Sequence, residues 1–275
     1  MKPELQRRVQ RYGWDKAAKF YENSWQTQLK PAHDLLLENV EIKPGDSILD
    51  IAAGTGLITF QMAKLLGPSG RIIATDISDE MIKIGTATAQ SNRFSNVEFK
   101  QMDAEILSFK NSSFDMVTCS LGLMYLPDPD RALQEMYRVL KPGGKVVVVV
   151  WGSRKRCGWA EIFPIVDARV SSDVCPMFFQ LGEGENLNYP FKKAGFENFT
   201  LKKISTNLHY NTADEACQAS FLGGPVAMAY SRFDEKTRNE AQQEFRASIE
   251  SFKTKSGYDI PGEFVVSFGY KPILA

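Results

Sequence analysis

Between Asp46 and Trp151, short apolar segments alternate with helical segments, and this alternation limits the fold more than any other feature of the sequence. The run Val146 to Val150 is apolar throughout, as in a strand that is buried on both faces. Strands that alternate with helices are typical of an open parallel sheet covered by helices. We expect strands at Ser47–Ile51, Arg71–Thr75, Val97–Met102, Phe114–Cys119 and Lys145–Val150.

The helical segments between these strands have recognisable ends. Ser78 is a favourable N-cap residue, and Asp79 and Glu80 follow in the first turn, where the helix dipole stabilises negative charge. Asp128 is placed in the same way before Pro129, which suits the first position of a helix. These residues therefore predict the starts of two of the helices that lie between the expected strands in the sequence.

The rest of the chain follows other patterns. Residues 1 to about 45 are amphipathic and predict helices, with Trp14, Ala17, Tyr21 and Trp25 at roughly helical spacing. Residues 152–190 are rich in aromatic residues, Gly and Pro and give no firm assignment. Beyond them we expect a long strand over 196–210, helices over 212–255 and a last strand over 263–270.

Composition excludes several classes of protein. The 275 residues include 33 Lys and Arg against 33 Asp and Glu, and zero net charge disfavours a nucleic-acid partner held by bulk electrostatics. No apolar run approaches the roughly 20 residues that span a bilayer, and no secretion signal is visible. The four cysteines form no C-x-x-C pair, which predicts reduced thiols, no metal site and a cytoplasmic location.

Acidic residues follow three of the expected strands at the end where an open α/β sheet binds ligands. Asp50 lies within the first strand, and Asp76 and Asp103 follow the second and third. Residues Asp50 to Gly56 form a turn of small residues into a helix. Glycine in such a turn allows a ligand to approach the backbone, because no Cβ fills the space.

Two classes of cofactor suit this arrangement. A dinucleotide site prefers the spacing G-x-G-x-x-G, but here Gly54 and Gly56 are followed by Thr59. A carboxylate at Asp50 would repel a pyrophosphate and attract an ammonium group, and opposite charges ~4 Å apart gain about 4 kcal/mol at an effective dielectric near 20. The carboxylates therefore favour S-adenosylmethionine (SAM), which carries an ammonium and a sulfonium.

The run Ile48-Leu49-Asp50-Ile51-Ala52-Ala53-Gly54-Thr55-Gly56 resembles motif I of class I SAM-dependent methyltransferases. The later run Arg138-Val139-Leu140-Lys141-Pro142-Gly143-Gly144-Lys145 is similar to the turn before the fifth strand in that family. The segment Asp76-Ile77-Ser78-x-x-Met81 is shared with the members that resemble ubiquinone/menaquinone-biosynthesis methyltransferases. The resemblance covers about residues 40 to 152.

This resemblance implies an α/β fold of the Rossmann-like type, with a seven-stranded, mostly parallel sheet whose last strand is antiparallel. We place that strand at 263–270, paired with 196–210. The whole chain, 1–275, would form a single methyltransferase domain. Its core would comprise 40–152, 191–210 and 262–275, and helical cap segments would comprise 1–39, 153–190 and 211–261.

The resemblance also implies which residues bind the cofactor. The methionine part would lie against the first turn and the end of the fourth strand, at Asp50, Ala52, Gly54, Thr55, Gly56 and Ser120. The ribose would bind Asp76, and the adenine would lie against Ile77, Met81, Asp103 and Ala104. The family often has glycine at the position of Ala52, whose methyl group leaves less room.

The acceptor is indicated only by the cap. Its aromatic side chains either line an acceptor pocket or form the core of the cap itself. They are Trp25, Trp159, Phe163, Phe178, Phe179, Phe191, Phe221 and Phe264. The preferred hypothesis is in-line methyl transfer to a small, partly apolar organic acceptor.

Several questions stay open from the sequence alone. The candidates for a general base are His33, His209, Tyr125, Glu161 and Asp167, and none is assigned as catalytic. Two other functions are compatible with parts of the pattern: a SAM-binding protein without turnover, and a nicotinamide-dependent oxidoreductase, which Thr59 and Asp50 disfavour. The oligomeric state and the methylated atom are not indicated.

Overall fold

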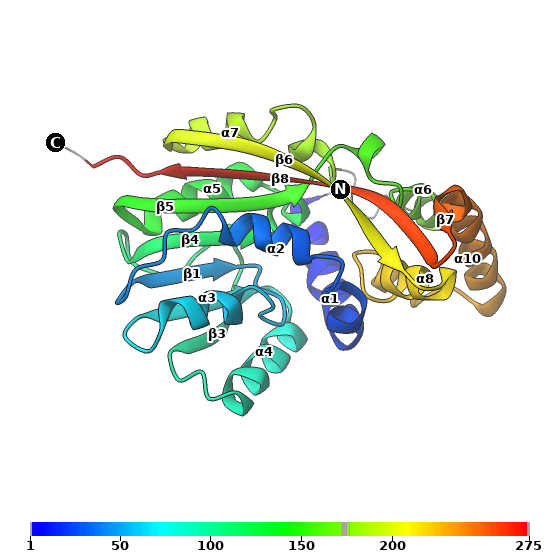
Figure 1. The fold of residues 1–275 in the computed structure, drawn as a ribbon, viewed down its shortest axis with the longest axis horizontal. Coiled ribbons are helices and arrows are strands. Elements are labelled where there is room, and N and C mark those ends of the chain that lie inside the picture. Colours follow the sequence, from blue (N-terminus) through cyan, green and yellow to red (C-terminus); the bar gives the residue numbers. More distant parts are fainter. Residues whose placement is uncertain (1, 172–174, 176, 274–275) are drawn as a thin grey trace.

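The strands form one mixed sheet in a computed structural model that describes residues 2–171, 175 and 177–273. Their order is β3-β2-β1-β4-β5-β8-β6, and β7 pairs with β8 (Figure 1). The strands are β1 Ser47–Ile51, β2 Arg71–Asp76, β3 Val97–Gln101, β4 Phe114–Ser120, β5 Leu140–Trp151, β6 Glu197–Tyr210, β7 Lys253–Thr254 and β8 Gly257–Tyr270.

Helices cover the sheet and its carboxyl end. They are α1 Pro3–Trp25, α2 Lys30–Leu37, α3 Thr59–Leu66, α4 Asp79–Ser91, α5 Pro129–Val139, α6 Ile162–Asp167, α7 Asn188–Ala194, α8 Ala213–Phe221, α9 Ala227–Tyr230 and α10 Glu235–Ile249. Short 3-10 turns cover η1 Leu123–Tyr125, η2 Arg154–Arg156, η3 Gln180–Gly182 and η4 Glu250–Phe252. In Figure 1, α2 and α3 lie in front of the sheet and α5 lies behind it.

The expected parallel sheet with an antiparallel last strand is confirmed. Strands β1 to β5 pair in parallel with their neighbours, whereas β8 runs antiparallel to both β5 and β6. Residues Val146 to Val150 of β5 are completely buried, as their continuous apolar run predicts. The predicted helix starts are also found, because the side chains of Ser78 and Asp128 each cap a helix.

Two strands are longer than the sequence predicts. Strand β5 begins at Leu140, because Leu140 already pairs with Phe114 of β4, and the register shifts over the Pro-Gly-Gly segment before Lys145 pairs with Met116. Strand β8 begins at Gly257, and its residues before Phe264 pair with β6 rather than with β5. Figure 1 shows this two-stranded extension reaching toward α8 and α10, beyond the end of β5.

Helix α1 lies at the end toward which β1 and β5 point, and it packs against α4, α8 and α9 (Figure 1). One face of α1 is buried, including Gly13, Ala17 and Ala18, so small residues allow close helix contacts.

The division into core and cap segments stays a prediction. Residues 1, 172–174, 176 and 274–275 of those segments lie outside the described residues.

The aromatic ring of Phe114 gives a test of how the sheet is anchored. Its side chain is 1% exposed at the start of β4 and packs edge-on against Phe109, with ring centroids 5.1 Å apart. We expect Phe114→Ala to lower the free energy of unfolding by about 3–5 kcal/mol, because a large buried side chain is lost and a cavity remains. Urea unfolding measures this change, and Ile106→Ala, 67% exposed, serves as the control with a change within about 0.5 kcal/mol. Equal effects of the two substitutions would contradict the packing described here.

Candidate functional site

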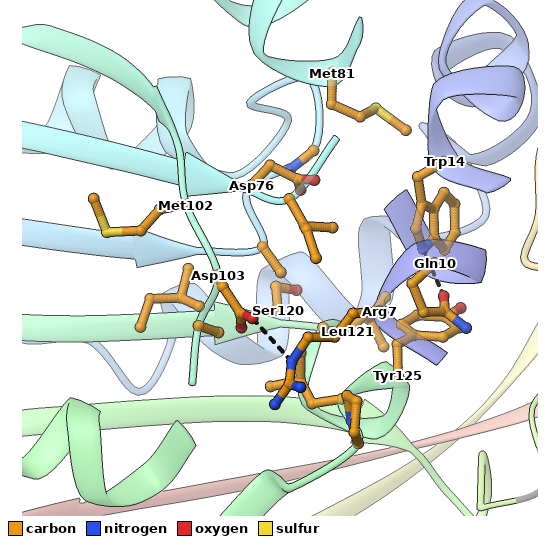
Figure 2. Close-up of a pocket in the computed structure, with 18 of the residues that line it drawn as sticks. Arg7, Gln10, Trp14, Asp76, Met81, Met102, Asp103, Ser120, Leu121 and Tyr125 are labelled. Carbon is orange, nitrogen blue, oxygen red and sulfur yellow. Dashed lines mark hydrogen bonds and ion pairs between the residues drawn. The ribbon is translucent and has the colours of Figure 1, made fainter. Parts of the chain in front are cut away.

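A cleft opens at the carboxyl ends of the central strands, between the sheet and α1. It holds about 730 Å³ of space free of protein atoms, open solvent at its mouth included. Figure 2 shows side chains from the sheet and from α1 on opposite sides of this space. The lining residues are Arg7, Gln10, Trp14, Tyr21, Ile51, Ala52, Gly54, Asp76, Ile77, Met81, Met102, Asp103, Ala104, Ser120, Leu121, Gly122, Tyr125, Leu126 and Pro127.

The structure brings most of the predicted site residues to this cleft, but three lie behind its wall. The predicted residues in the lining are Ala52, Gly54, Asp76, Ile77, Met81, Asp103, Ala104 and Ser120. Asp50, Thr55 and Gly56 are completely or largely buried and do not line it. These three residues therefore determine the shape and charge of the turn, but they form no part of the cleft surface.

The turn after β1 depends on left-handed backbone. Ala52, Gly54 and Gly56 have φ values of 52°, 58° and 97°, a region that favours glycine. This conformation explains why glycine suits the position of Ala52, where an alanine costs roughly 1–2 kcal/mol. A Cβ on Gly122 would lie 2.3 Å from the Cβ of Ala52, so a glycine at 122 makes room for the alanine at 52.

Asp76, at the end of β2, holds two turns together. Its carboxylate accepts hydrogen bonds from the backbone N–H of Gly54 and of Ser78, each at 2.9 Å. The residue is 8% exposed, and burial raises the pKa of Asp76 to about 6 although these hydrogen bonds act in the opposite direction. A carboxylate with spare acceptor capacity therefore faces the cleft from a fixed position.

Asp50 lies beneath the first turn and is completely buried. Its carboxylate accepts hydrogen bonds from the hydroxyls of Thr59, at 2.5 Å, and Thr118, at 2.9 Å. Burial raises the pKa of Asp50 to about 6, against the effect of these two hydrogen bonds. The threonine that replaces the third glycine of a dinucleotide motif is thus a partner of Asp50, and the expected direct contact of Asp50 with the cleft is not found.

Asp103, after β3, is engaged by the N-terminal helix. The Arg7 guanidinium lies 3.0 Å from an Asp103 carboxylate oxygen (Figure 2). It also pairs with Glu105. The other oxygen of Asp103 accepts the backbone N–H of Glu105 at 2.9 Å. Arg7 therefore ties α1 to the third strand end.

Helix α1 supplies residues that the sequence did not indicate as part of the site. Gln10, Trp14 and Tyr21 line the cleft together with Arg7, and the Trp14 ring lies 5.2 Å from that of Tyr125. The helical spacing of Trp14 and Tyr21 signalled that this face is buried. The resemblance placed residues 1–39 in the cap, but which side chains of this helix reach the cleft depends on tertiary packing.

Contacts between α1 and the start of α4 hold the helix over the cleft. The Asp15 carboxylate accepts hydrogen bonds from the Ser78 hydroxyl, at 2.6 Å, and from the backbone N–H of Glu80, at 3.2 Å. The Gln6 amide donates to the backbone carbonyl of Tyr125 at 3.2 Å. These bonds attach α1 at two separate points, to the start of α4 and to Tyr125.

Among the candidate bases, Tyr125 lines the cleft and the others do not. Burial lowers the pKa of His33 to about 4 within α2, and His209 pairs with Asp259 at the surface. Burial raises the pKa of Tyr125 well above its ordinary value, which makes its hydroxyl a hydrogen-bonding group rather than a base at neutral pH.

The Ser120 hydroxyl and the four cysteine thiols are the remaining polar groups to place. The Ser120 hydroxyl is buried at the cleft and has no hydrogen-bond partner in the described part of the chain. All four cysteines are buried and free. The residues that the structure describes contain no cluster of ligands suited to a metal ion, and no helix among them is long and apolar enough to cross a membrane.

Comparisons with known proteins agree with this geometry. The model of the ubiE/COQ5 methyltransferase family matches residues 28–207. The ubiquinone/menaquinone biosynthesis C-methyltransferase UbiE of Teredinibacter turnerae is 43% identical over 189 residues, which are 68% of this chain and 74% of that protein. The enzyme of the same name from Pseudoalteromonas translucida is 39% identical over 192 residues, with the same coverage.

A solved structure shows the same fold. Phosphoethanolamine N-methyltransferase 2 of Haemonchus contortus, in complex with S-adenosylhomocysteine, aligns with a TM-score of 0.59 and 18% identity over 88% of this chain and 53% of that chain. Fold and cleft are those of a class I SAM-dependent methyltransferase of small molecules. More narrowly, the chain belongs to the ubiE/COQ5 methyltransferase family. This membership decides against the nicotinamide-dependent alternative.

The buried Asp50 predicts a specific dependence of stability on pH. Because burial raises its pKa to about 6 from an ordinary 3.8, the folded protein binds the proton more tightly than the unfolded chain does. The stability of the wild type relative to Asp50→Asn should therefore rise as the pH falls from about 7 to about 4, by up to about 3 kcal/mol. Urea unfolding at a series of pH values measures this difference. A difference that is constant, or that grows with rising pH, would show that Asp50 is not a burial-perturbed carboxyl.

Proposed function

We propose that the cleft binds SAM, with the adenosine part along the ends of β2 and β3 and the methionine part against the turn after β1. The observation that carries this proposal is Asp76, a carboxylate that is 8% exposed and fixed by two backbone N–H groups at the end of β2. Ribose hydroxyls are donors that match its remaining acceptor sites. A phosphate group offers no such donors and would be repelled.

The charge of the site supports a cationic ligand. Asp50 and Asp76 are both buried, and in the described part of the chain neither forms an ion pair with Lys, Arg or His. Uncompensated buried carboxylates raise the local affinity for positive charge. SAM carries an ammonium and a sulfonium, so Asp50 would act on it through the turn rather than by direct contact.

Each end of the ligand has a matching group in the lining. The Ser120 hydroxyl, which lacks a protein partner, would bind the polar methionine end, where Gly54 leaves the backbone open. Asp103 would accept the adenine amino group while keeping Arg7, because a carboxylate has about four acceptor sites. Ile77, Met81 and Ala104 would cover the adenine ring with apolar surface.

When bound, SAM supplies a methyl group that its sulfonium already activates for displacement. The chain's own residues then have to exclude water and hold the acceptor in line, which supplies most of the rate enhancement in such a reaction. Trp14, Leu121 and Tyr125 close the cleft on the side facing α1 and form a mainly apolar surface there. We propose a small, partly apolar acceptor, and a carbon as the methylated atom because the relatives are named C-methyltransferases.

Asp76→Asn tests the assignment of the cofactor site. The substitution keeps the size of the side chain but removes its charge and replaces one acceptor oxygen, which faces a backbone N–H, with a donor NH2 group. S-adenosylhomocysteine should therefore bind roughly tenfold to a hundredfold more weakly. Isothermal titration calorimetry measures the affinity. Asp79→Asn is the matched control, because Asp79 pairs with Lys83 at the surface, and its affinity should equal that of the wild type. An unchanged affinity in Asp76→Asn would refute the assignment.

Turnover is tested with SAM that carries a labelled methyl group. We expect label transfer to small, partly apolar acceptors that have a nucleophilic carbon, with one S-adenosylhomocysteine and one proton released for each methyl group transferred. Most of this transfer should be lost in Asp76→Asn at limiting SAM. Transfer to nitrogen or oxygen acceptors alone would overturn the proposed carbon acceptor. S-adenosylhomocysteine binding without transfer to any class of acceptor would identify a SAM-binding protein without turnover.

A further inference from the structure

A groove lies on a face of α1 that does not line the cofactor cleft. It runs between α1, α4 and the segment that holds α9 and the start of α10, and it contains about 980 Å³ of space free of protein atoms, open solvent included. We name it the basic groove, after Lys16, Lys19 and Arg238 in its lining. Among the described residues it shares no lining residue with the cleft, whereas an aromatic cavity beside the cleft shares Trp14 and Tyr21 with it.

The three basic side chains of the groove come from two helices. Lys16 and Lys19 are exposed on α1 and lie three residues apart, so they are neighbours on the helix surface. Arg238 comes from the first turn of α10 and is half-buried. In the described part of the chain none of the three forms an ion pair. Positive charges that gather in a cleft without acidic partners attract anions.

Two acidic side chains also line the groove, and both already have donors. The Asp15 carboxylate accepts hydrogen bonds from the Ser78 hydroxyl and from the backbone N–H of Glu80. The Glu80 carboxylate lies 2.8 Å from the Nζ of Lys83, which is not part of the lining. The acids of the groove are therefore engaged at the start of α4, and its basic groups remain available to a ligand.

The Arg238 guanidinium is held by contacts that leave most of its donors free. Its Cζ lies 5.5 Å from the ring centroid of Tyr230, and one Nη donates to the backbone carbonyl of Ser231 at 3.0 Å. The Tyr230 hydroxyl in turn accepts from the Gln242 amide at 2.7 Å, which fixes the ring. The Nε of Arg238 is buried and has no acceptor in the described part of the chain. A fixed guanidinium with spare donors is suited to an anion that presents two oxygens side by side.

Apolar surface adjoins these charges. Phe20 of α1, Ile84 of α4 and Leu222, which follows α8, are half-buried side chains that line the groove. The Nζ of Lys19 lies 4.8 Å from the ring centroid of Phe20, so a positive charge stands directly beside this surface. Burial of apolar area by a ligand would be favourable there.

We propose that the basic groove binds a phosphate monoester that carries an apolar group. Arg238, Lys16 and Lys19 would hold the phosphate, and the apolar group would lie against Phe20 and Ile84. A monoester has three terminal oxygens and a charge of about −1.5 to −2 at neutral pH, which matches an arginine fork and two ammonium groups. The inference goes beyond the proposed function and does not depend on it, because the groove and the cleft have separate linings.

The test uses calorimetric titration of the whole protein in the presence of S-adenosylhomocysteine. The probes are octyl phosphate, octyl sulfate and inorganic phosphate, each below any concentration at which it forms micelles. Octyl sulfate has the same chain and a similar head group but a single charge, and inorganic phosphate lacks the apolar group. We expect saturable binding of octyl phosphate, several-fold weaker binding of octyl sulfate, and binding of inorganic phosphate weaker by roughly tenfold or more. Equal affinity for octyl sulfate would overturn the assignment of a phosphate monoester.

Substitutions locate the binding. Arg238→Gln should weaken binding of octyl phosphate roughly tenfold or more, because it removes a charged donor. Since it also removes the contact with Tyr230, a second variant combines Lys16→Gln with Lys19→Gln at two exposed side chains and should weaken binding by roughly tenfold. Lys236→Gln is the matched control, because it removes the same charge from α10 outside the groove and should bind as the wild type does.

A lipid head group and a soluble phosphate ester offer the same chemistry, and vesicles distinguish them. Vesicles of equal parts phosphatidylcholine and phosphatidic acid present phosphate monoesters at their surface. Sedimentation of the wild type, but not of Arg238→Gln, with these vesicles and not with phosphatidylcholine alone would support the inference with a lipid as the source. Saturable binding of octyl phosphate without such sedimentation would support it with a soluble ester.

The outcomes separate this inference from the proposed function. Absence of saturable octyl phosphate binding, or equal affinity in the wild type, Arg238→Gln and the double lysine variant, would overturn the inference and identify the three basic side chains as solvated surface charges. The affinity for S-adenosylhomocysteine should stay the same in every variant, because none of the replaced residues lines the cleft. Failure of the wild type to bind S-adenosylhomocysteine would refute the proposed function and leave the groove to be judged by the octyl probes.

Discussion

The two hydrogen bonds that Asp76 accepts from the backbone of Gly54 and Ser78 join the turn after β1 to the turn after β2. Neighbouring parallel strands bring these turns together, the Ala53 N–H donates to the Thr75 carbonyl, and the shared acceptor Asp76 joins the two turns directly. The carboxylate is then held in a site where burial raises its pKa to about 6. The same residue thus sets the geometry of the cleft and gives it negative charge.

The position of α1 over the cleft depends on the same hydrogen bonds of Asp76. Ser78, whose backbone N–H donates to Asp76, also donates its hydroxyl to Asp15 of α1. Arg7 makes a second attachment at Asp103, one strand further along the sheet. Asp76 and Asp103 therefore line the cleft and also help to hold the helix that covers it. Figure 2 shows side chains of α1 on the side of the cleft that faces these two residues.

The sequence was sufficient to predict the sheet because each parallel strand carries a local signal. The apolar run of β5 and the caps at Ser78 and Asp128 are such signals, and the antiparallel pairing of β8 with β5 and β6 followed from the resemblance. The part played by Asp50 was not predictable in this way. Its partners Thr59 and Thr118 lie on a helix and a strand that meet it only in the folded chain.

The same reason explains the residues that the sequence did not reveal. Gly122 stands out only once the methyl group of Ala52 is seen to occupy the space beside it. Arg7 and Trp14 lie on a helix that the resemblance placed in the cap, but neither residue was predicted to line the cleft. The aromatic residues of the cap left two interpretations open. Trp25 and Trp159 line a cavity and also belong to the packed core, to which Phe191 and Phe221 belong as well.

The aromatic cavity beside the cleft is lined partly by segments at the two ends of the chain, and this bears on how the enzyme relates to its relatives. The family match spans residues 28–207, and it includes the strand ends and turns of the cleft. Trp14, Tyr21 and Trp25 precede that span, and Gly224 and Pro225 follow it. Mutations in these flanking segments can therefore reshape the wall of that cavity while the turn after β1 stays intact. A fragment trimmed to the matched span would lack these parts of the cavity wall.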